Sequence, residues 1–107
     1  MGISTGARGQ ARQWRRIQGE ILRGVALAGT AQSLSPRELG LGEEPVTRAA
    51  LALPVWAWVR YGETPIRVEA EVVAWTEHAG AVRWLVPGLG VHKAWVWSGA
   101  IEPRPPE

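Results

Sequence analysis

The sequence contains no cysteine, so disulfides and metal sites built on thiolates are excluded. For the same reason, cysteine usage gives no indication of the redox compartment. Only His78 and His92 could offer an imidazole ligand, and the glutamates are scattered along the chain. We therefore predict that the protein binds no metal and no cofactor.

Long apolar runs are also lacking. The longest, Ala49 to Val59, is interrupted by Pro54 and falls far short of the roughly 20 residues of a membrane-spanning helix. The arginine-containing N-terminal segment lacks the compact apolar core of a signal peptide. We expect a soluble cytoplasmic protein without a membrane partner, located in the host cytoplasm or the virion if it is phage-encoded.

Aspartate, asparagine and phenylalanine are absent, and a single lysine stands beside eleven arginines. This preference for arginine, together with abundant Ala, Gly, Pro and Trp, is typical of a GC-rich bacterial or phage genome. A chain of 107 residues is long enough to bury one core, which favours a single domain.

Positive charge is concentrated near the N-terminus. Residues 1 to 25 hold five arginines and one glutamate, a net charge of +4. The remainder has seven basic and nine acidic side chains, a net charge of −2. The basic character therefore belongs to the first segment, and a partner attracted by it would be acidic.

Residues 7 to 29 show the three- and four-residue spacing of an amphipathic helix. The apolar side chains fall within a sector of about 80°, and they are Trp14, Ile17, Ile21, Val25 and Ala28. The arginines fall on the opposite side within about 100°, and they are Arg8, Arg12, Arg15, Arg16 and Arg23. Because Gly19 and Gly24 each weaken such a helix by about 1 kcal/mol relative to alanine, we expect its apolar stripe to be docked.

Residues 1 to 6 are expected to be flexible, and residues 30 to 50 read as a connector. Within the connector, Ser35, Pro36 and Glu38 fit the N-cap, N1 and N3 positions of a capping box. We predict a single helical turn there, ended by Gly40 or Gly42.

From residue 51 the apolar period changes to two, which is typical of strands. Four runs, 51–61, 66–76, 81–86 and 93–97, are separated by connections short enough for hairpins. The pattern predicts an antiparallel meander over residues 51 to 102, with a possible fifth pairing at Ile101. The proline-rich tail, 103–107, is expected to be flexible. The predicted fold class is α+β, with the N-terminal helix packed on a small β-barrel.

Alternation along the strands sorts the side chains onto two faces. Small and β-branched residues such as Val59, Val72 and Ala94 share one face, which suits a barrel interior. Tryptophans share the other, apart from Trp84, which we place in the inner set. Two interpretations of the outer rings stay open. They pack under the apolar stripe of the helix or at the barrel ends, or some form an exposed stacking surface. The candidates for that surface are Trp58, Tyr61, Trp75 and Trp95.

Residues 54 to 103 resemble the SH3-like barrel of Tudor and related small domains. The resemblance is carried by an apolar opening strand followed by RVEAEVVAWT, GAVRWLV and KAWVWSGAIEP. It implies a five-stranded barrel, and Tudor-type cages for methylated residues combine aromatic rings with an acid or amide. Trp58, Tyr61 and Trp75 could supply the rings and Glu77 the acid. SH3-like barrels have many unrelated roles, so the resemblance fixes no function.

The strongest functional feature is the arginine face of the helix, because planar multi-donor guanidinium groups suit phosphates. Catalysis has little support: the paired Glu69 and Glu71 are typical of a solvated strand edge, and neither histidine has a nucleophile near it in sequence. The sequence predicts a non-enzymatic nucleic-acid-associated protein that contacts phosphates through its N-terminal arginines. The alternative is a protein-interaction or assembly module, such as a phage structural or connector protein or a host-protein binder, with a tryptophan-rich interface and a possible homo-oligomeric state.

Overall fold

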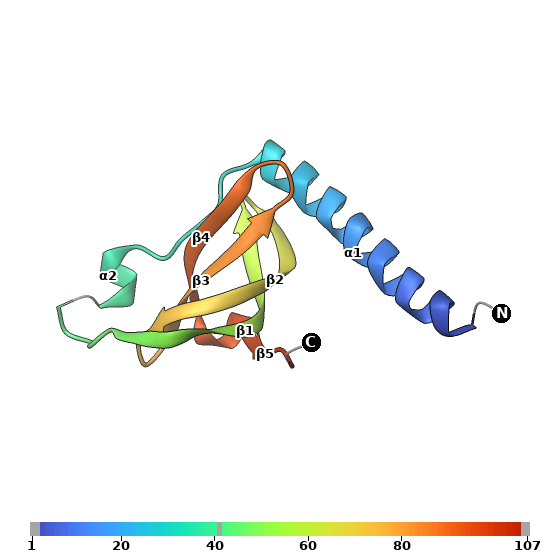
Figure 1. Ribbon diagram of the computed structural model, residues 1–107. Coiled ribbons are helices and arrows are strands. Elements are labelled where there is room, and N and C mark those ends of the chain that lie inside the picture. Colours follow the sequence, from blue (N-terminus) through green and yellow to red (C-terminus); the bar gives the residue numbers. More distant parts are fainter. Residues whose placement is uncertain (1–2, 41, 106–107) are drawn as a thin grey trace.

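The computed structural model describes residues 3 to 40 and 42 to 105, without the side chains of residues 3 to 8 and 11 (Figure 1). Its helices are α1 (Ile3–Ala28) and α2 (Pro36–Leu39), and a 3-10 turn spans Ser98–Ala100. Its strands are β1 (Thr47–Tyr61), β2 (Thr64–Trp75), β3 (Ala79–Val86), β4 (Gly90–Trp97) and β5 (Ile101–Pro103). The predicted combination of one long helix and an antiparallel sheet is confirmed.

The five strands form one sheet in the order β4-β3-β2-β1-β5, and every neighbouring pair is antiparallel. The meander from β1 to β4 follows the predicted hairpins. The fifth pairing is also present, because Ile101 lies opposite Ala57 where β5 pairs with β1. Gly62 has a φ of 61° in the first hairpin turn, a left-handed conformation that side chains with a Cβ rarely adopt.

Helix α2 begins and ends as its sequence predicts. The Ser35 side chain accepts a hydrogen bond from the backbone N–H of Glu38, and the Glu38 carboxylate accepts one from the N–H of Ser35. Gly40 ends the turn with a φ of 67°. Helix α1 begins at Ile3, four residues before its predicted start at residue 7. Residues 1 and 2 lie outside the described part.

The prediction of a barrel goes further than the structure, because the described edge strands β4 and β5 are not paired with each other. Instead, the connector after α1 lies between β1 and β4 and bonds to both. The N–H of Gln32 donates to the carbonyl of Arg60 at 2.8 Å, and the N–H of Leu34 donates to the carbonyl of Trp95 at 2.9 Å. The carbonyls of Arg60 and Trp95 are thus satisfied by this irregular segment rather than by a strand.

The core lies on the face predicted to be interior. Its buried side chains come from alternating positions of the strands, among them Val55, Ala57, Val59, Val68, Ala70, Val72, Val82, Val86 and Ala94. Trp84 also lies in the core, as its alternation with Val82 and Val86 predicts. Burial of this apolar surface is the main contribution to the stability of the sheet.

A hydrogen-bonded aromatic cluster fills one end of the core. The indole N–H of Trp84 donates to the Tyr61 hydroxyl at 2.9 Å, and that hydroxyl lies 2.6 Å from Nδ1 of His92. The Trp84 ring meets the Tyr61 ring edge to face, with centroids 6.3 Å apart. Burial raises the pKa of Tyr61 above its usual 10, and the Trp84 hydrogen bond opposes that rise.

The apolar contact of helix α1 with the core is made by its C-terminal half, and its N-terminal end projects away from the sheet (Figure 1). The contact is made by buried Leu22 together with Val25 and Ala26. The chain comes close to the sheet at Gly29, where a Cβ would lie 2.9 Å from the carbonyl carbon of Tyr61. No helix in the described ranges combines the length and apolar character needed to cross a membrane.

The prediction that the apolar stripe of α1 docks on the sheet is therefore wrong. Of the expected apolar stripe only Val25 packs against the core, while Trp14, Ile17 and Ile21 are 62%, 41% and 48% exposed. The residues that dock lie roughly 100° around the helix from the centre of that stripe, on the flank between the stripe and the arginines. Consequently, both the apolar stripe and the arginine face remain accessible.

This docking predicts unequal roles for two leucines of α1. Leu22 is 7% exposed, so Leu22→Ala should lower the free energy of unfolding by about 2 to 3 kcal/mol. Leu27 is 62% exposed, and Leu27→Ala should change it by less than about 0.5 kcal/mol. Urea denaturation followed by tryptophan fluorescence measures both. Equal destabilisation by the two substitutions would contradict the observed docking flank.

The buried hydroxyl of Tyr61 predicts that the protein loses stability at alkaline pH. Tyr61 is the only tyrosine, so tyrosinate absorbance reports its ionisation alone, with a midpoint above 10 in the native protein and about 10 in denaturant. Because the folded protein holds this proton more tightly, stability should fall as the pH rises above about 10. Tyr61→Phe should remove this pH dependence and destabilise the fold by about 1 to 3 kcal/mol at neutral pH, since it leaves the Trp84 N–H buried without its acceptor. A native midpoint at or below that of the denatured chain would refute this assignment.

Candidate functional site

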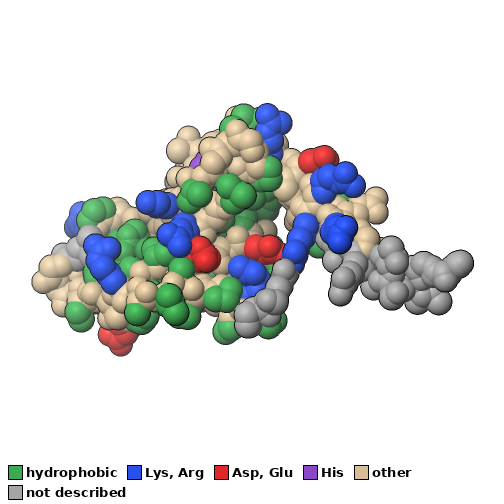
Figure 2. All heavy atoms as spheres, in the orientation of Figure 1, with side chains coloured by type: hydrophobic (Ala, Val, Ile, Leu, Met, Phe, Trp, Pro, Cys, Tyr) green, Lys and Arg blue, Asp and Glu red, His purple; other side chains and the backbone are tan. Residues whose placement is uncertain are grey.

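The described arginines of α1 share one exposed face, seen as basic side chains along the helix in Figure 2. They are Arg12, Arg15, Arg16 and Arg23. Arg8 belongs to the same helix, but its side chain lies outside the described part. The N-terminal part of this face, with Arg12, lies on the half of α1 that projects from the sheet, where a large ligand could approach it.

Contacts with the sheet hold two of these arginines. Nε of Arg15 lies 3.7 Å from a carboxylate oxygen of Glu69 on β2, and both side chains are about half exposed. An ion pair of this kind contributes only about 0 to 1 kcal/mol, so it orients Arg15 without removing it from solvent. Arg23 reaches the β3–β4 turn, where its Nε is 3.1 Å from the position of a Cβ on Gly88. The arginine face thus lies beside the sheet at Arg15 and Arg23.

The other arginines that could have extended this face lie elsewhere. Arg37 is in α2 and Arg48 is at the start of β1, both across the sheet from α1 (Figure 1). Arg60 lines a groove beside the connector. The sequence could not show this, since the positions depend on how the connector crosses the sheet.

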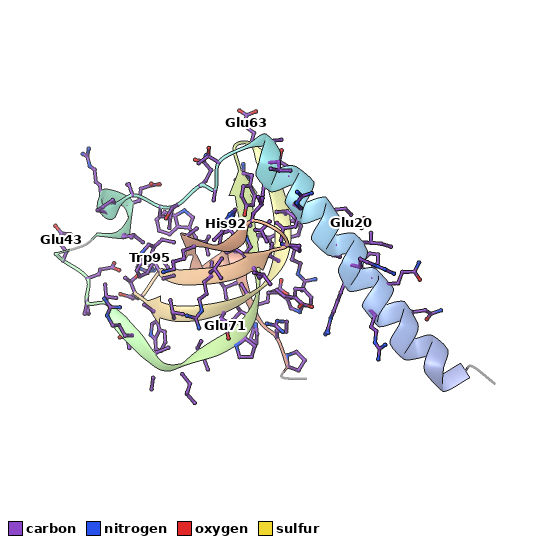
Figure 3. All side chains as sticks on the ribbon, turned by 45° about the horizontal axis from the view of Figure 1, so that its top comes forward. Glu20, Glu43, Glu63, Glu71, His92 and Trp95 are labelled. Carbon is purple, nitrogen blue, oxygen red and sulfur yellow. The ribbon has the colours of Figure 1, made fainter. Side chains whose placement is uncertain are left out.

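That groove is the second candidate site. It has a volume of about 620 Å³ and lies between the connector and strands β1 and β4. Its aromatic walls are Trp58, Trp95 and Trp97, and Glu38 and Arg60 are the charged residues in its lining. The connector holds Trp95 in place through the hydrogen bond from its N–H to Oγ of Ser33 at 2.9 Å. Figure 3 shows Trp95 on the connector side of the sheet.

The structure does not bring the four residues of the predicted aromatic surface together. Trp58 and Trp95 both line the groove, whereas Trp75 is partly exposed but is not part of its lining. Tyr61 is 3% exposed and belongs to the core, so its assignment to an exposed surface is wrong. It follows the alternation of Val55, Ala57 and Val59, and this pattern could have placed it inside. Trp97, which was not among the candidates, lines the groove because the connector passes beside the end of β4.

The ring of Trp56 lies against two cations. The guanidinium carbon of Arg67 lies 4.4 Å from the centre of the indole, and that of Arg104 lies 5.9 Å from it. Arg104 also donates to the carbonyls of Val55 and Ala70, both at 3.2 Å. These contacts attach the segment after β5 to β1 and β2.

A small ion cluster joins the connector to the β2–β3 turn. Nε2 of His78 lies 3.8 Å from Glu44 and 4.0 Å from Glu77. Each of these three side chains offers one potential metal-ligand atom, and the three atoms lie within 4.8 Å of one another. The imidazole and the two carboxylates also suit a surface ion pair, so the geometry does not require an ion. Glu77, the acid suggested by the Tudor resemblance, faces His78 here and is not part of the groove lining.

Comparison of the chain with protein-family models, with curated proteins and with solved structures found no match. The resemblance to SH3-like domains therefore stays a prediction from the sequence pattern, and the functional argument depends on the geometry described above.

Proposed function

We propose that this protein is a non-enzymatic nucleic-acid-associated protein that binds the phosphate backbone through the arginine face of α1. One observation carries the proposal: the arginines of α1 share a face that remains accessible on a helix projecting from the sheet. Guanidinium groups bind phosphates through planar, multi-donor geometry, and such contacts supply affinity without reading sequence.

The dimensions of the face suit a polyanion better than a small anion. Along α1, Arg12 and Arg23 are about 16 Å apart at 1.5 Å per residue. Consecutive phosphates of one DNA strand rise by about 3.4 Å, so the face spans about five phosphate steps. Glu20, labelled in Figure 3, is the only described acidic residue of α1. The proposal covers DNA and RNA, because both present the same phosphate charge.

Exposed tryptophans support a second candidate, an interaction or assembly module of bacterial or phage origin. Trp58 and Trp97 are 48% and 47% exposed while lining the groove, and tryptophan is enriched at the centres of protein interfaces. In this function the groove receives a protein partner and the arginines are a solvated helix face. The two candidates differ in which side chains a partner protects from solvent.

The leading proposal predicts salt-dependent binding of labelled single-stranded DNA, duplex DNA and RNA, measured by fluorescence anisotropy. The logarithm of the association constant should fall linearly with the logarithm of salt concentration, because phosphate contacts release counterions. Replacing Arg12 and Arg16 together by glutamine should reduce the magnitude of that slope by about 1.8 on a duplex.

The matched control is Arg67→Gln with Arg83→Gln, which removes the same charge from β2 and β3, where these arginines pair with Glu102 and Glu71. It should leave the slope within about 0.5 of the wild-type value. An equal loss in both double variants would indicate attraction by net charge alone and contradict a dedicated face. Absence of binding at about 50 mM salt, or binding to anionic lipid vesicles without binding to nucleic acid, would also refute the proposal.

A further inference from the structure

The exposed apolar side of α1 has the spacing of a coiled-coil seam. Steps of four and three residues alternate along it, through Gln10, Trp14, Ile17, Ile21, Gly24 and Ala28. All six residues are exposed, although Trp14, Ile17 and Ile21 are large and apolar. The flank of α1 that docks on the sheet lies elsewhere around the helix, so the sheet does not cover this seam.

Within the described part of a single chain, no contact accounts for a glycine at position 24 of this seam. Glycine weakens a helix interior, and a close approach by another element is one reason for its presence. Gly9 of α1, outside the seam, has no such approach within the described chain. Gly19 and Gly29 have such approaches, since a Cβ at either position would meet Pro87 or Tyr61. A Cβ at Gly24 would meet nothing within 4 Å.

We propose that a second copy of this chain covers the seam, with the two α1 helices packed antiparallel. If Ile17 lies against Ile21 of the second copy, the same register sets Trp14 against Gly24 and Gln10 against Ala28. The largest side chain of the seam then faces the position without a side chain, and it does so twice because the contact has two-fold symmetry. A parallel pair would instead set Trp14 against Trp14 and Gly24 against Gly24, which leaves a gap at the glycines.

The charges of α1 permit this arrangement. The arginine sector is centred about 170° from the seam, so the guanidinium groups of both copies point away from the contact. Arg15, at the edge of that sector, is held toward Glu69 of its own sheet. The dimer therefore brings no arginines together at its centre. It also leaves both arginine faces open, and it does not depend on the proposed nucleic-acid binding.

Light scattering after size exclusion tests the oligomeric state. The wild-type protein should have twice the monomer mass of 11.7 kDa at concentrations of about 100 µM. Trp14→Ala and Ile17→Lys should each weaken association by about tenfold or more. Leu27→Ala removes an exposed apolar side chain outside the seam and should leave the mass unchanged. A wild-type monomer at this concentration, or equal dissociation by Leu27→Ala, would overturn the proposal.

Exchanging the largest and the smallest residue of the seam tests the register through recovery of the dimer. Gly24→Leu, which favours the helix but fills the space for Trp14, should dissociate the dimer while circular dichroism shows that α1 is intact. The double variant Trp14→Gly with Gly24→Trp should recover the dimer, because each large residue again faces a glycine. An undiminished dimer in Gly24→Leu, or a monomeric exchange variant with intact helix content, would contradict the register.

The absence of native cysteine allows a direct test of orientation. An equimolar mixture of Ile17→Cys and Ile21→Cys chains, differing in mass through a tag, should form mainly mixed disulfides on mild oxidation. Disulfides confined to like chains would indicate a parallel pair and overturn the antiparallel assignment. Absence of cross-linking under conditions that oxidise a tethered control dithiol would argue against the seam contact itself.

Discussion

The attachment of the connector to the ends of β1 and β4 decides which faces α1 presents. Backbone hydrogen bonds from Gln32 and Leu34 hold this segment between the two strands, and Gly29 lies against the backbone of Tyr61. With its C-terminal end held there, the helix can pack only its nearest flank on the sheet. That flank holds Leu22, so neither of the two sectors that stand out in the sequence is buried.

Local features of this fold were predictable because their causes are local. The capping box at Ser35 and Glu38 is a contact over three residues, and the alternation that buries Val59 and exposes Trp58 follows directly from strand geometry. The pairing of successive strands was equally accessible, since the turns between them are short. These features predict most of the sheet and one wall of the groove.

The rotation of α1 about its axis was not predictable from the same pattern. An apolar stripe indicates that something covers it, but not whether the cover comes from the same chain. Trp14 was expected against the sheet and is exposed, whereas Leu22, outside the stripe, is buried. The groove also required the fold, because its walls come from the connector, β1 and β4, and because Trp97 became part of it only through the path of the connector.

A helix with two exposed and chemically opposite sides can separate self-association from ligand binding. The seam through Ile17 and Ile21 offers apolar contact, while Arg12 and Arg16 offer charge on the other side. Interaction at one side need not exclude the other, because their centres lie nearly half a turn apart. The groove at Trp58 and Trp95 is a third surface, formed by the connector, β1 and β4 rather than by the projecting half of α1.

The contacts of Arg104 with β1 and β2 have a consequence for the edge of the sheet. By bonding to the carbonyls of Val55 and Ala70, Arg104 keeps the short β5 beside β1, although only three residue pairs join these strands. Without β5, the backbone of β1 from Val55 to Ala57 would present unpaired amide and carbonyl groups beside a hydrophobic core, a known template for strand addition by another chain. Arg104 thereby helps to keep this stretch of β1 paired.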